Sequence, residues 1–281
     1  FLGARYARME LTTNNIPEFI RRLADITDLD HKERSDLRDV LGKQFGEGRH
    51  SETLSSQNEA YERVRGIMAS EKLFDVTQEP QKVRDRYGPT QFAEQTLIAR
   101  RLVEAGVPFV RVGRAWWDSH GQNFETHQEM VPELDHVMAT LLDDLGERGM
   151  LDDVMVMTLA EFGRTPSINA SLGRDHFASA WSCTISGAGI KRGSVYGKSD
   201  PKGNTVVAEE VDAGSLFATV YSALGLDPNL TGKRGVLSRE PLMARRFYDQ
   251  IRRIISGSSE GHVQRGKASA QGAPKGGQGC K

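Results

Sequence analysis

Residues 130–159 read MVPELDHVMATLLDDLGERGMLDDVMVMTL, and this stretch decides the predicted fold. Its first half places apolar side chains every three or four positions, which predicts an amphipathic helix that ends at Gly149. Its last six residues, 154–159, are β-branched or large and apolar, which favours a short buried strand. The stretch therefore predicts a helix that leads into a strand covered on both faces.

The same order of elements recurs on either side of this stretch. Upstream, residues 90–105 have a helical period that stops at Gly106, and the apolar run 107–112 follows. Downstream, a third apolar run at residues 182–186 precedes a Gly-rich turn. Because parallel strands need crossover connections, this alternation predicts an α/β fold, with a mostly parallel sheet in a three-layer α/β/α core.

The flanking segments predict additional helices and a tail. Residues 16–70 are charged and helical in period, with a Gly-containing loop at 42–51, and we expect two or three helices there. Helices are also expected near residues 212–224 and 241–255. The end of the chain has almost no large apolar side chains, which predicts disorder. The predicted organisation is a helical layer or lid at 1–88, the α/β core at 89–255 and a disordered tail at 256–281.

Composition excludes several classes of function. The 281 residues include 37 Lys or Arg and 38 Asp or Glu, so a net charge of -1 gives no overall attraction to nucleic acid or acidic membranes. The tail has few charges and no aromatic residues for base stacking, and no apolar stretch is long enough for a membrane span. Cys183 and Cys280 lie in contrasting contexts, which argues against a disulfide framework. The oligomeric state stays open.

Candidate metal ligands follow or approach the predicted strands, where open α/β sheets place their ligands. Asp118 and His120 stand two residues apart at a turn that ends in Gly121, Glu161 follows the second strand, and His176 precedes the third. Carboxylates together with imidazoles suit zinc, manganese or iron(II) better than calcium or magnesium. The sequence thus predicts a transition-metal site built from separate loops.

Each of these signals has a plainer interpretation. Arg164 and Arg174 could bind the anionic oxygens of a phosphoryl or sulfuryl group, but Arg174 could equally be a salt-bridge partner. Asp118 and His120 alone could form a capped turn, and Glu161 could begin a helix. Asp175 could orient a neighbouring ligand. Two adjacent tryptophans, Trp116 and Trp117, are expected in the core or in a pocket wall.

Five motifs resemble those of the bacterial family known as domain of unknown function 1501, an alkaline-phosphatase-like and sulfatase-like branch. They are RDRYG at 84–88, ARRLVEAGV at 99–107, WDSHG at 117–121, EFGRTP at 161–166 and GRDH at 173–176. The resemblance extends to about residue 227. It implies an alkaline-phosphatase-like core, hydrolysis of phosphate or sulfate esters by analogy with the wider superfamily, and export from a bacterial cell to the periplasm or beyond.

The resemblance also implies roles for individual ligands. Asp118, His120 and His176 would serve one metal ion, and Glu161 would stand where relatives carry the Asp of an Asp-His pair. Phe162 occupies the histidine position of that pair. We therefore expect a second metal site that is altered, and weak or empty.

Other family features are not found in these residues. Family members begin with a strand and a Gly-Gly-x-Ser-like segment that would supply the nucleophile, and nothing before Arg5 matches it. The Cys-x-Pro-x-Arg motif of typical sulfatases is also not present. Two interpretations stay open: a zinc- or manganese-dependent hydrolase of small anionic esters, and a non-catalytic exported binding protein that retains the hydrolase fold.

Overall fold

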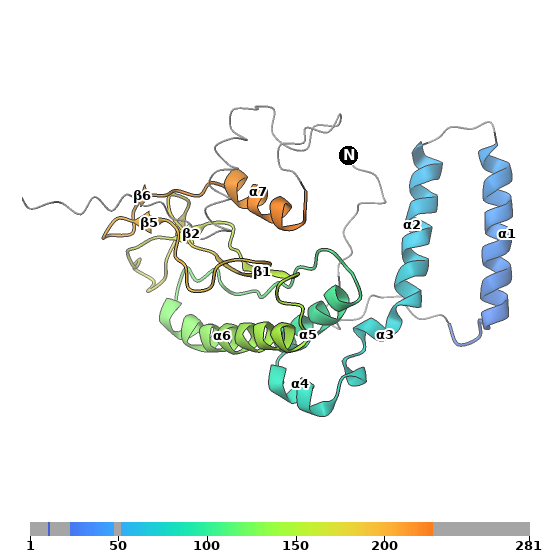
Figure 1. Ribbon diagram of the computed structural model, residues 1–281, viewed down its shortest axis with the longest axis horizontal. Coiled ribbons are helices and arrows are strands. Elements are labelled where there is room, and N and C mark those ends of the chain that lie inside the picture. Colours follow the sequence, from blue (N-terminus) through green and yellow to red (C-terminus); the bar gives the residue numbers. More distant parts are fainter. Residues whose placement is uncertain (1–10, 12–22, 48–51, 227–281) are drawn as a thin grey trace, which may run out of the picture. The chain divides into compact units, whose positions relative to one another are not determined.

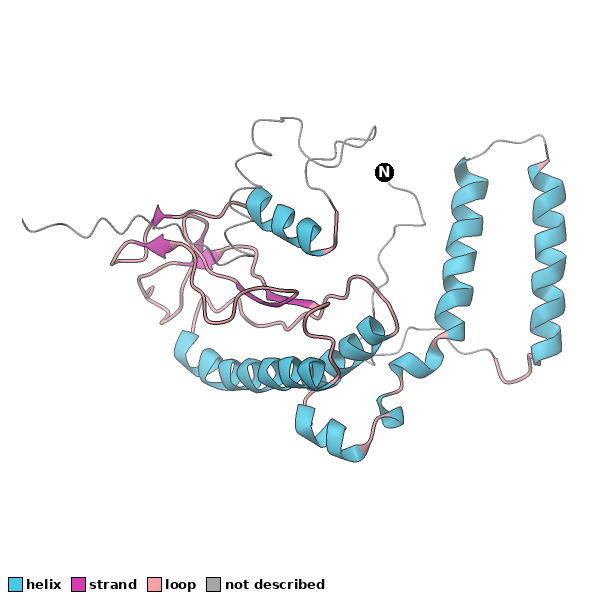
Figure 2. Ribbon diagram, in the orientation of Figure 1, coloured by secondary structure: helices cyan, strands magenta, loops and turns pink. Residues whose placement is uncertain are grey.

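The computed structural model describes residues 11, 23–47 and 52–226, and this part of the chain is mainly helical (Figures 1 and 2). Its helices are α1 (Asp28–Gly46), α2 (Glu52–Ala69), α3 (Glu71–Phe74), the 3₁₀ helix η2 (Val76–Gln78), α4 (Gln81–Tyr87), α5 (Gln91–Glu104), α6 (Asn123–Glu147) and α7 (Ala213–Ala223). Its strands are β1 (Met155–Thr158), β2 (Gly163–Arg164), β3 (His176–Phe177), β4 (Thr184–Gly187), β5 (Lys198–Ser199) and β6 (Val206–Ala208).

The chain divides into two compact units. The first comprises Phe1–Ala188 and Asp200–Thr205, and the second comprises Gly189–Ser199 and Val206–Lys281. Among the described elements, β5, β6 and α7 belong to the second unit, and all others belong to the first. The boundaries that the sequence suggested after residues 88 and 255 stay predictions.

The core of the first unit forms where α4, α5 and α6 meet (Figure 1). Thr90 begins α5 because its side chain accepts a hydrogen bond from the Ala93 amide, and Gly106, with φ +91°, follows its end. The buried apolar side chains of this core are Tyr87, Phe92, Ala93, Leu97, Val137, Leu141 and Leu145. A smaller cluster of Phe74, Ile98 and Leu102 joins α3 to α5. The predicted helices at 90–105 and 130–145 are therefore confirmed.

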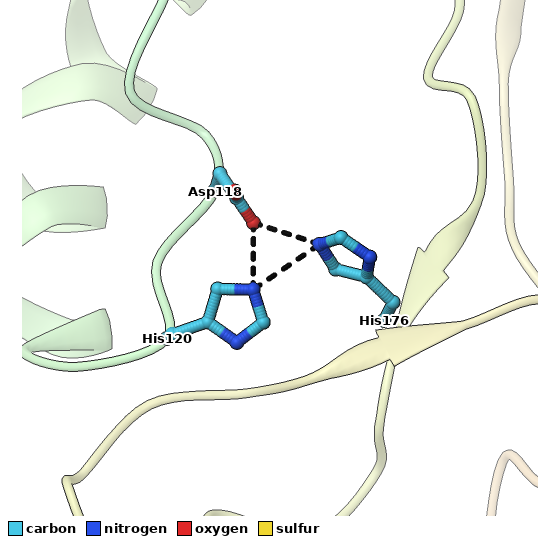
Figure 3. Close-up of side chains that lie close together, drawn as sticks. All are labelled: Asp118, His120 and His176. Carbon is cyan, nitrogen blue, oxygen red and sulfur yellow. Dashed lines mark hydrogen bonds and ion pairs between the residues drawn. The ribbon is translucent and has the colours of Figure 1, made fainter.

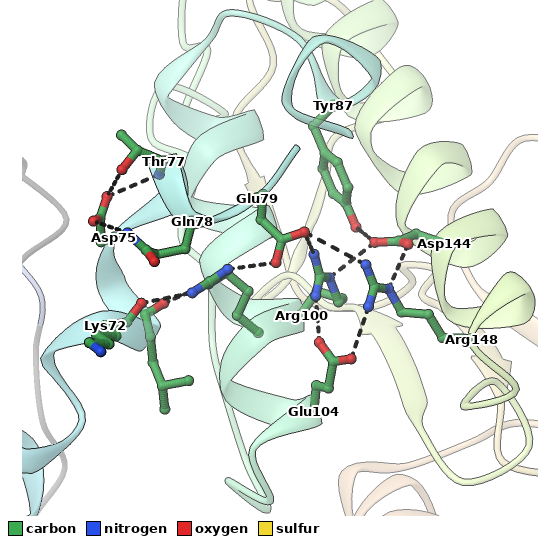
Figure 4. Close-up of polar contacts among 12 residues, drawn as sticks. Lys72, Asp75, Thr77, Gln78, Glu79, Tyr87, Arg100, Glu104, Asp144 and Arg148 are labelled. Carbon is green, nitrogen blue, oxygen red and sulfur yellow. Dashed lines mark hydrogen bonds and ion pairs between the residues drawn. The ribbon is translucent and has the colours of Figure 1, made fainter. Parts of the chain in front are cut away.

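A buried cluster of charges also joins these helices (Figure 4). The Arg100 side chain has no exposed surface, and it forms ion pairs with Glu79 at 2.8 Å and Asp144 at 3.0 Å. Tyr87 donates a hydrogen bond to Asp144 at 2.9 Å, and Arg148 pairs with the same carboxylate at 2.8 Å. Because a buried charge is costly without a partner, these contacts tie α4, α5 and α6 to one arrangement.

The predicted parallel sheet is wrong. β1 pairs with β4, β2 with β3 and β5 with β6, all antiparallel, and no parallel pair occurs within residues 52–226. The three-layer α/β/α, alkaline-phosphatase-like core is therefore not the fold of the described residues. The predicted strand at 154–159 does form, as β1, and that at 182–186 forms as β4.

Two physical reasons explain the difference. The run 107–112 forms no strand, because no strand of the described residues pairs with it; Val107, Val110 and Val112 instead pack against the core clusters. Residues 159–183 contain no helix to carry the chain back for a parallel pairing. Instead, residues 159–183 turn the chain back so that Thr184 lies opposite Thr158 in an antiparallel ladder.

The flanking helices agree with the sequence where they are described. α1 and α2 lie within residues 16–70, and α1 continues to Gly46, further into the expected loop than predicted. α7 confirms the helix expected near residues 212–224. The expected helix at 241–255 and the tail at 256–281 lie outside the described residues. No helix in the described ranges combines the length and apolarity that crossing a membrane requires.

Candidate metal centre

Two remote segments meet to form the site. In the β2–β3 hairpin, Arg164 lies opposite His176. The loop that carries Asp118 and His120 joins this region through the Arg174 amide, which donates to the Ser119 carbonyl at 3.0 Å. A further bridge links Gly121 to Leu172. Antiparallel pairing thus brings residues 118–120 next to residue 176, where the sequence predicts that a parallel sheet would do so.

Gly173 allows this close approach. A β-carbon at this position would lie 2.0 Å from the carbonyl carbon and oxygen of His120 and 2.3 Å from the Gly121 nitrogen. These atoms belong to the backbone and cannot move aside cheaply. Glycine is therefore required where the 171–174 turn crosses the ligand-bearing loop.

Asp118, His120 and His176 form a compact group of potential ligands (Figure 3). Asp118 Oδ1 lies 3.0 Å from His120 Nε2 and 3.0 Å from His176 Nε2, and the two ring nitrogens are 3.1 Å apart. Ligand atoms at about 2.1 Å from one metal ion are about 3.0 Å apart when they subtend a right angle and about 3.4 Å apart in a tetrahedron. This donor set could hold a transition-metal ion.

Hydrogen bonds orient the His120 ring. Its Nδ1 lies 2.8 Å from Asp175 Oδ1, and Asn169 Nδ2 donates to the same oxygen at 3.2 Å and to the His120 carbonyl at 3.1 Å. A carboxylate on Nδ1 favours the tautomer with the proton there, which leaves the Nε2 lone pair for a metal. The predicted orienting role of Asp175 is therefore supported by geometry.

Neighbouring hydrogen-bond donors and charges keep the carboxylates of Asp118 and Asp175 ionised. Hydrogen bonds from Arg164, at 2.5 Å, and His176, at 3.0 Å, hold the pKa of Asp118 at about 2. Hydrogen bonds with His120 and Asn169 lower the pKa of Asp175 below its usual range. Both groups are exposed, so their charge is available to a cation at neutral pH.

The other predicted site residues have different surroundings. Glu161 is exposed in the bend between β1 and β2 and is not part of the three-residue group. Arg164 lies beside the group through its contact with Asp118. Arg174 donates from Nη1 to the carbonyls of Thr165 and Pro166, both at 2.6 Å, and so holds the turn in place. Of the two arginines, Arg164 is the one in contact with a candidate ligand.

Two contributors were not foreseen in these roles. The Phe162 ring lies 4.2 Å from the His176 ring, centroid to centroid, so this residue supports a ligand. Asn169 accepts hydrogen bonds from the amides of Ser171 and Gly173, at 3.0 and 2.9 Å, besides holding Asp175. Asn is typical of such turns, but only its spatial neighbours reveal a role at the site.

The fold and the site thus define a class: a helical protein with small antiparallel hairpins and an exposed Asp-His-His group that could hold a metal ion. The chain belongs to the family described as "Protein of unknown function (DUF1501)", whose profile matches residues 1–239. This match confirms the family resemblance, and the wider superfamily relation stays a prediction. Neither a curated protein nor a solved structure matches the chain.

Proposed function

We propose that this protein hydrolyses small phosphate or sulfate esters at a divalent-metal site formed by Asp118, His120 and His176. The observation that supports the proposal is the triangle of one carboxylate oxygen and two imidazole nitrogens, 3.0 to 3.1 Å apart. Zinc and manganese are the ions that suit such mixed ligands. A divalent ion there would act as a Lewis acid on the ester and promote attack by water.

The surrounding residues support an anionic substrate. Arg164 contacts Asp118 and has a side chain that is 21% exposed, so its positive charge faces both the ligands and solvent. A guanidinium beside a cation is suited to bind the oxygens of a phosphoryl or sulfuryl group. Arg174 would contribute indirectly, since its hydrogen bonds shape the turn that carries Asp175.

The position of Glu161 favours a second function, which is metal binding without catalysis. Because this carboxylate is not part of the group, the described ligands suffice for one ion and do not form a two-metal site. A protein that binds a metal ion without catalysing a reaction would need no more than this. The following experiment separates the two functions.

Metal content and turnover should be measured on the same samples. The protein is loaded with Zn²⁺ or Mn²⁺, dialysed, analysed for bound metal, and assayed with p-nitrophenyl phosphate and p-nitrophenyl sulfate. We expect about one ion per chain and turnover of at least one ester, and His120→Ala should lose both. His31→Ala, on α1, is the matched control and should change neither. A full complement of metal with no turnover would support the binding protein instead.

A further inference from the structure

A cavity of about 460 Å³ adjoins the candidate metal centre. Asp118 and His120 form part of its wall, and the rest includes Arg114, Trp116 and Glu129. It therefore lies between the ligand-bearing loop and the first turns of α6. This volume is in the range of small-molecule sites, and an ester bound at the metal would extend its remaining atoms into it.

Trp116 provides an open aromatic surface at this cavity. Its residue surface is 77% exposed, and its backbone has φ +75°, a conformation that is unfavourable for a bulky side chain. The next residue, Trp117, instead packs edge-on against His127 at a centroid distance of 5.6 Å. The backbone thus turns Trp116 away from the packing that its neighbour makes, which leaves the indole available to a ligand.

The remaining wall is rich in hydrogen-bonding groups. Glu129 is an exposed acceptor, Thr126 has a hydroxyl that can donate or accept, and Arg114 is held by Glu133 at 2.8 Å. A simple aryl or alkyl group would make no hydrogen bond to Glu129 or Thr126. A sugar ring matches them, because its C–H face can lie on an indole while its hydroxyls bond to the carboxylate and guanidinium.

We infer that the substrate is a phosphate or sulfate monoester of a pyranose sugar, with the sugar ring on Trp116 and its hydroxyls at Glu129 and Arg114. This inference rests on the proposed function for the placement of the ester group at the metal. The cavity itself supports the sugar, and the two parts can be tested apart.

Calorimetric binding separates the contributions of ring and ester. With Zn²⁺-loaded protein we expect glucose 6-sulfate or glucose 6-phosphate to bind at least tenfold more tightly than ethyl sulfate or ethyl phosphate. Trp116→Ala should reduce this advantage to less than twofold and leave Zn²⁺ affinity unchanged. Trp181→Ala, at another exposed tryptophan, is the matched control and should retain the full advantage. Glu129→Gln, a milder change, should weaken the binding of the sugar esters several-fold and leave the binding of the ethyl esters unchanged.

Methyl glucoside, which has no ester, tests the ring site alone. Its binding should depend on Trp116 both with Zn²⁺ and after removal of metal by EDTA. If this dependence holds while no ester is hydrolysed, the hydrolase proposal fails and the sugar site stands. The inference is overturned if sugar and ethyl esters bind equally, if Trp181→Ala loses as much as Trp116→Ala, or if phenyl sulfate is the preferred Trp116-dependent ligand.

Discussion

At the residue scale, the candidate centre depends on side chains that bind no metal themselves. Asp175 fixes the His120 ring through Nδ1, and Asn169 holds Asp175. A partner of this kind raises the basicity of a ligand and selects its tautomer, and its loss typically costs about 10- to 100-fold in metal affinity. The contribution of Asp175 can therefore be measured without any assumption about the reaction.

Asp175→Asn should weaken Zn²⁺ binding by about 10- to 100-fold, because a neutral amide holds the Nδ1 proton less strongly than a carboxylate does. Competition with a chromophoric chelator would give the dissociation constant. Asp152→Asn, at an exposed position in the turn before β1, removes the same charge elsewhere and should have no more than a twofold effect. Equal losses in the two variants would show that net charge matters and that orientation does not.

Gly173→Ala should abolish the site by steric means. The added methyl would lie 2.0 Å from backbone atoms of His120, so the loop that carries Asp118 and His120 must shift. We expect Zn²⁺ affinity to fall at least 100-fold, together with a loss of stability. Gly42→Ala in α1 meets no atom within 4 Å and should instead stabilise the helix by roughly 0.5–1 kcal/mol. Normal Zn²⁺ binding by Gly173→Ala would contradict the arrangement described above.

At the element scale, the buried charge cluster decides how the helices pack. Burial alone would raise the pKa of Glu79 and Asp144, but charged and hydrogen-bonding partners lower it by more. For Glu79 these partners are Arg100 and Arg101. For Asp144 they are Arg148, Tyr87 and Arg100. The pKa of each carboxyl is therefore below its ordinary value. In the unfolded chain these groups have pKa values near 4.5 for Glu and 3.8 for Asp, and above that pH the ion pairs contribute their full stabilisation. This contribution is lost as the pH falls through the lower pKa values of the folded state.

Acid should therefore destabilise the first unit. The urea midpoint is expected to stay level from pH 7 to about pH 5 and to fall below about pH 4. Asp144→Asn should lower the free energy of unfolding at pH 7 by on the order of 3 kcal/mol, because it leaves Arg100 buried beside one fewer negative charge. It should also reduce the fall in the urea midpoint below about pH 4. Glu147→Gln removes an exposed partner of Arg86 and should cost less than about 1 kcal/mol. If the urea midpoint of Asp144→Asn falls below about pH 4 as steeply as that of the unmodified protein, the buried charge cluster is not the cause of the acid sensitivity.

At the scale of the whole molecule, metal binding should be linked to folding. The ligands come from segments about 56 residues apart in sequence, which the unfolded chain cannot hold together. A Zn²⁺ concentration 100 times the dissociation constant should add about 2.7 kcal/mol to the free energy of unfolding. Thermal melts with and without Zn²⁺ would measure this shift, which His120→Ala should lose and His31→Ala should keep. A melt that is indifferent to Zn²⁺ would contradict the proposed site.

The sequence by itself determined several local elements and three residues of the candidate site. Helical periodicity located α5, α6 and α7, and apolar runs located β1 and β4, because these patterns depend on near neighbours in the chain. The types of Asp118, His120 and His176 were enough to suggest a transition metal. The family resemblance also followed from local motifs.

Only the tertiary structure decided how these pieces pair. The run 107–112 looked like a strand but packs on helices, and β1 and β4 run antiparallel because residues 159–183 contain no crossover helix. The β2–β3 register and the glycine at 173, not a parallel sheet, bring the ligands together and leave Glu161 out of the group. Strand partners and close backbone approaches are contacts between distant residues, and a pattern of neighbours along the chain does not specify them.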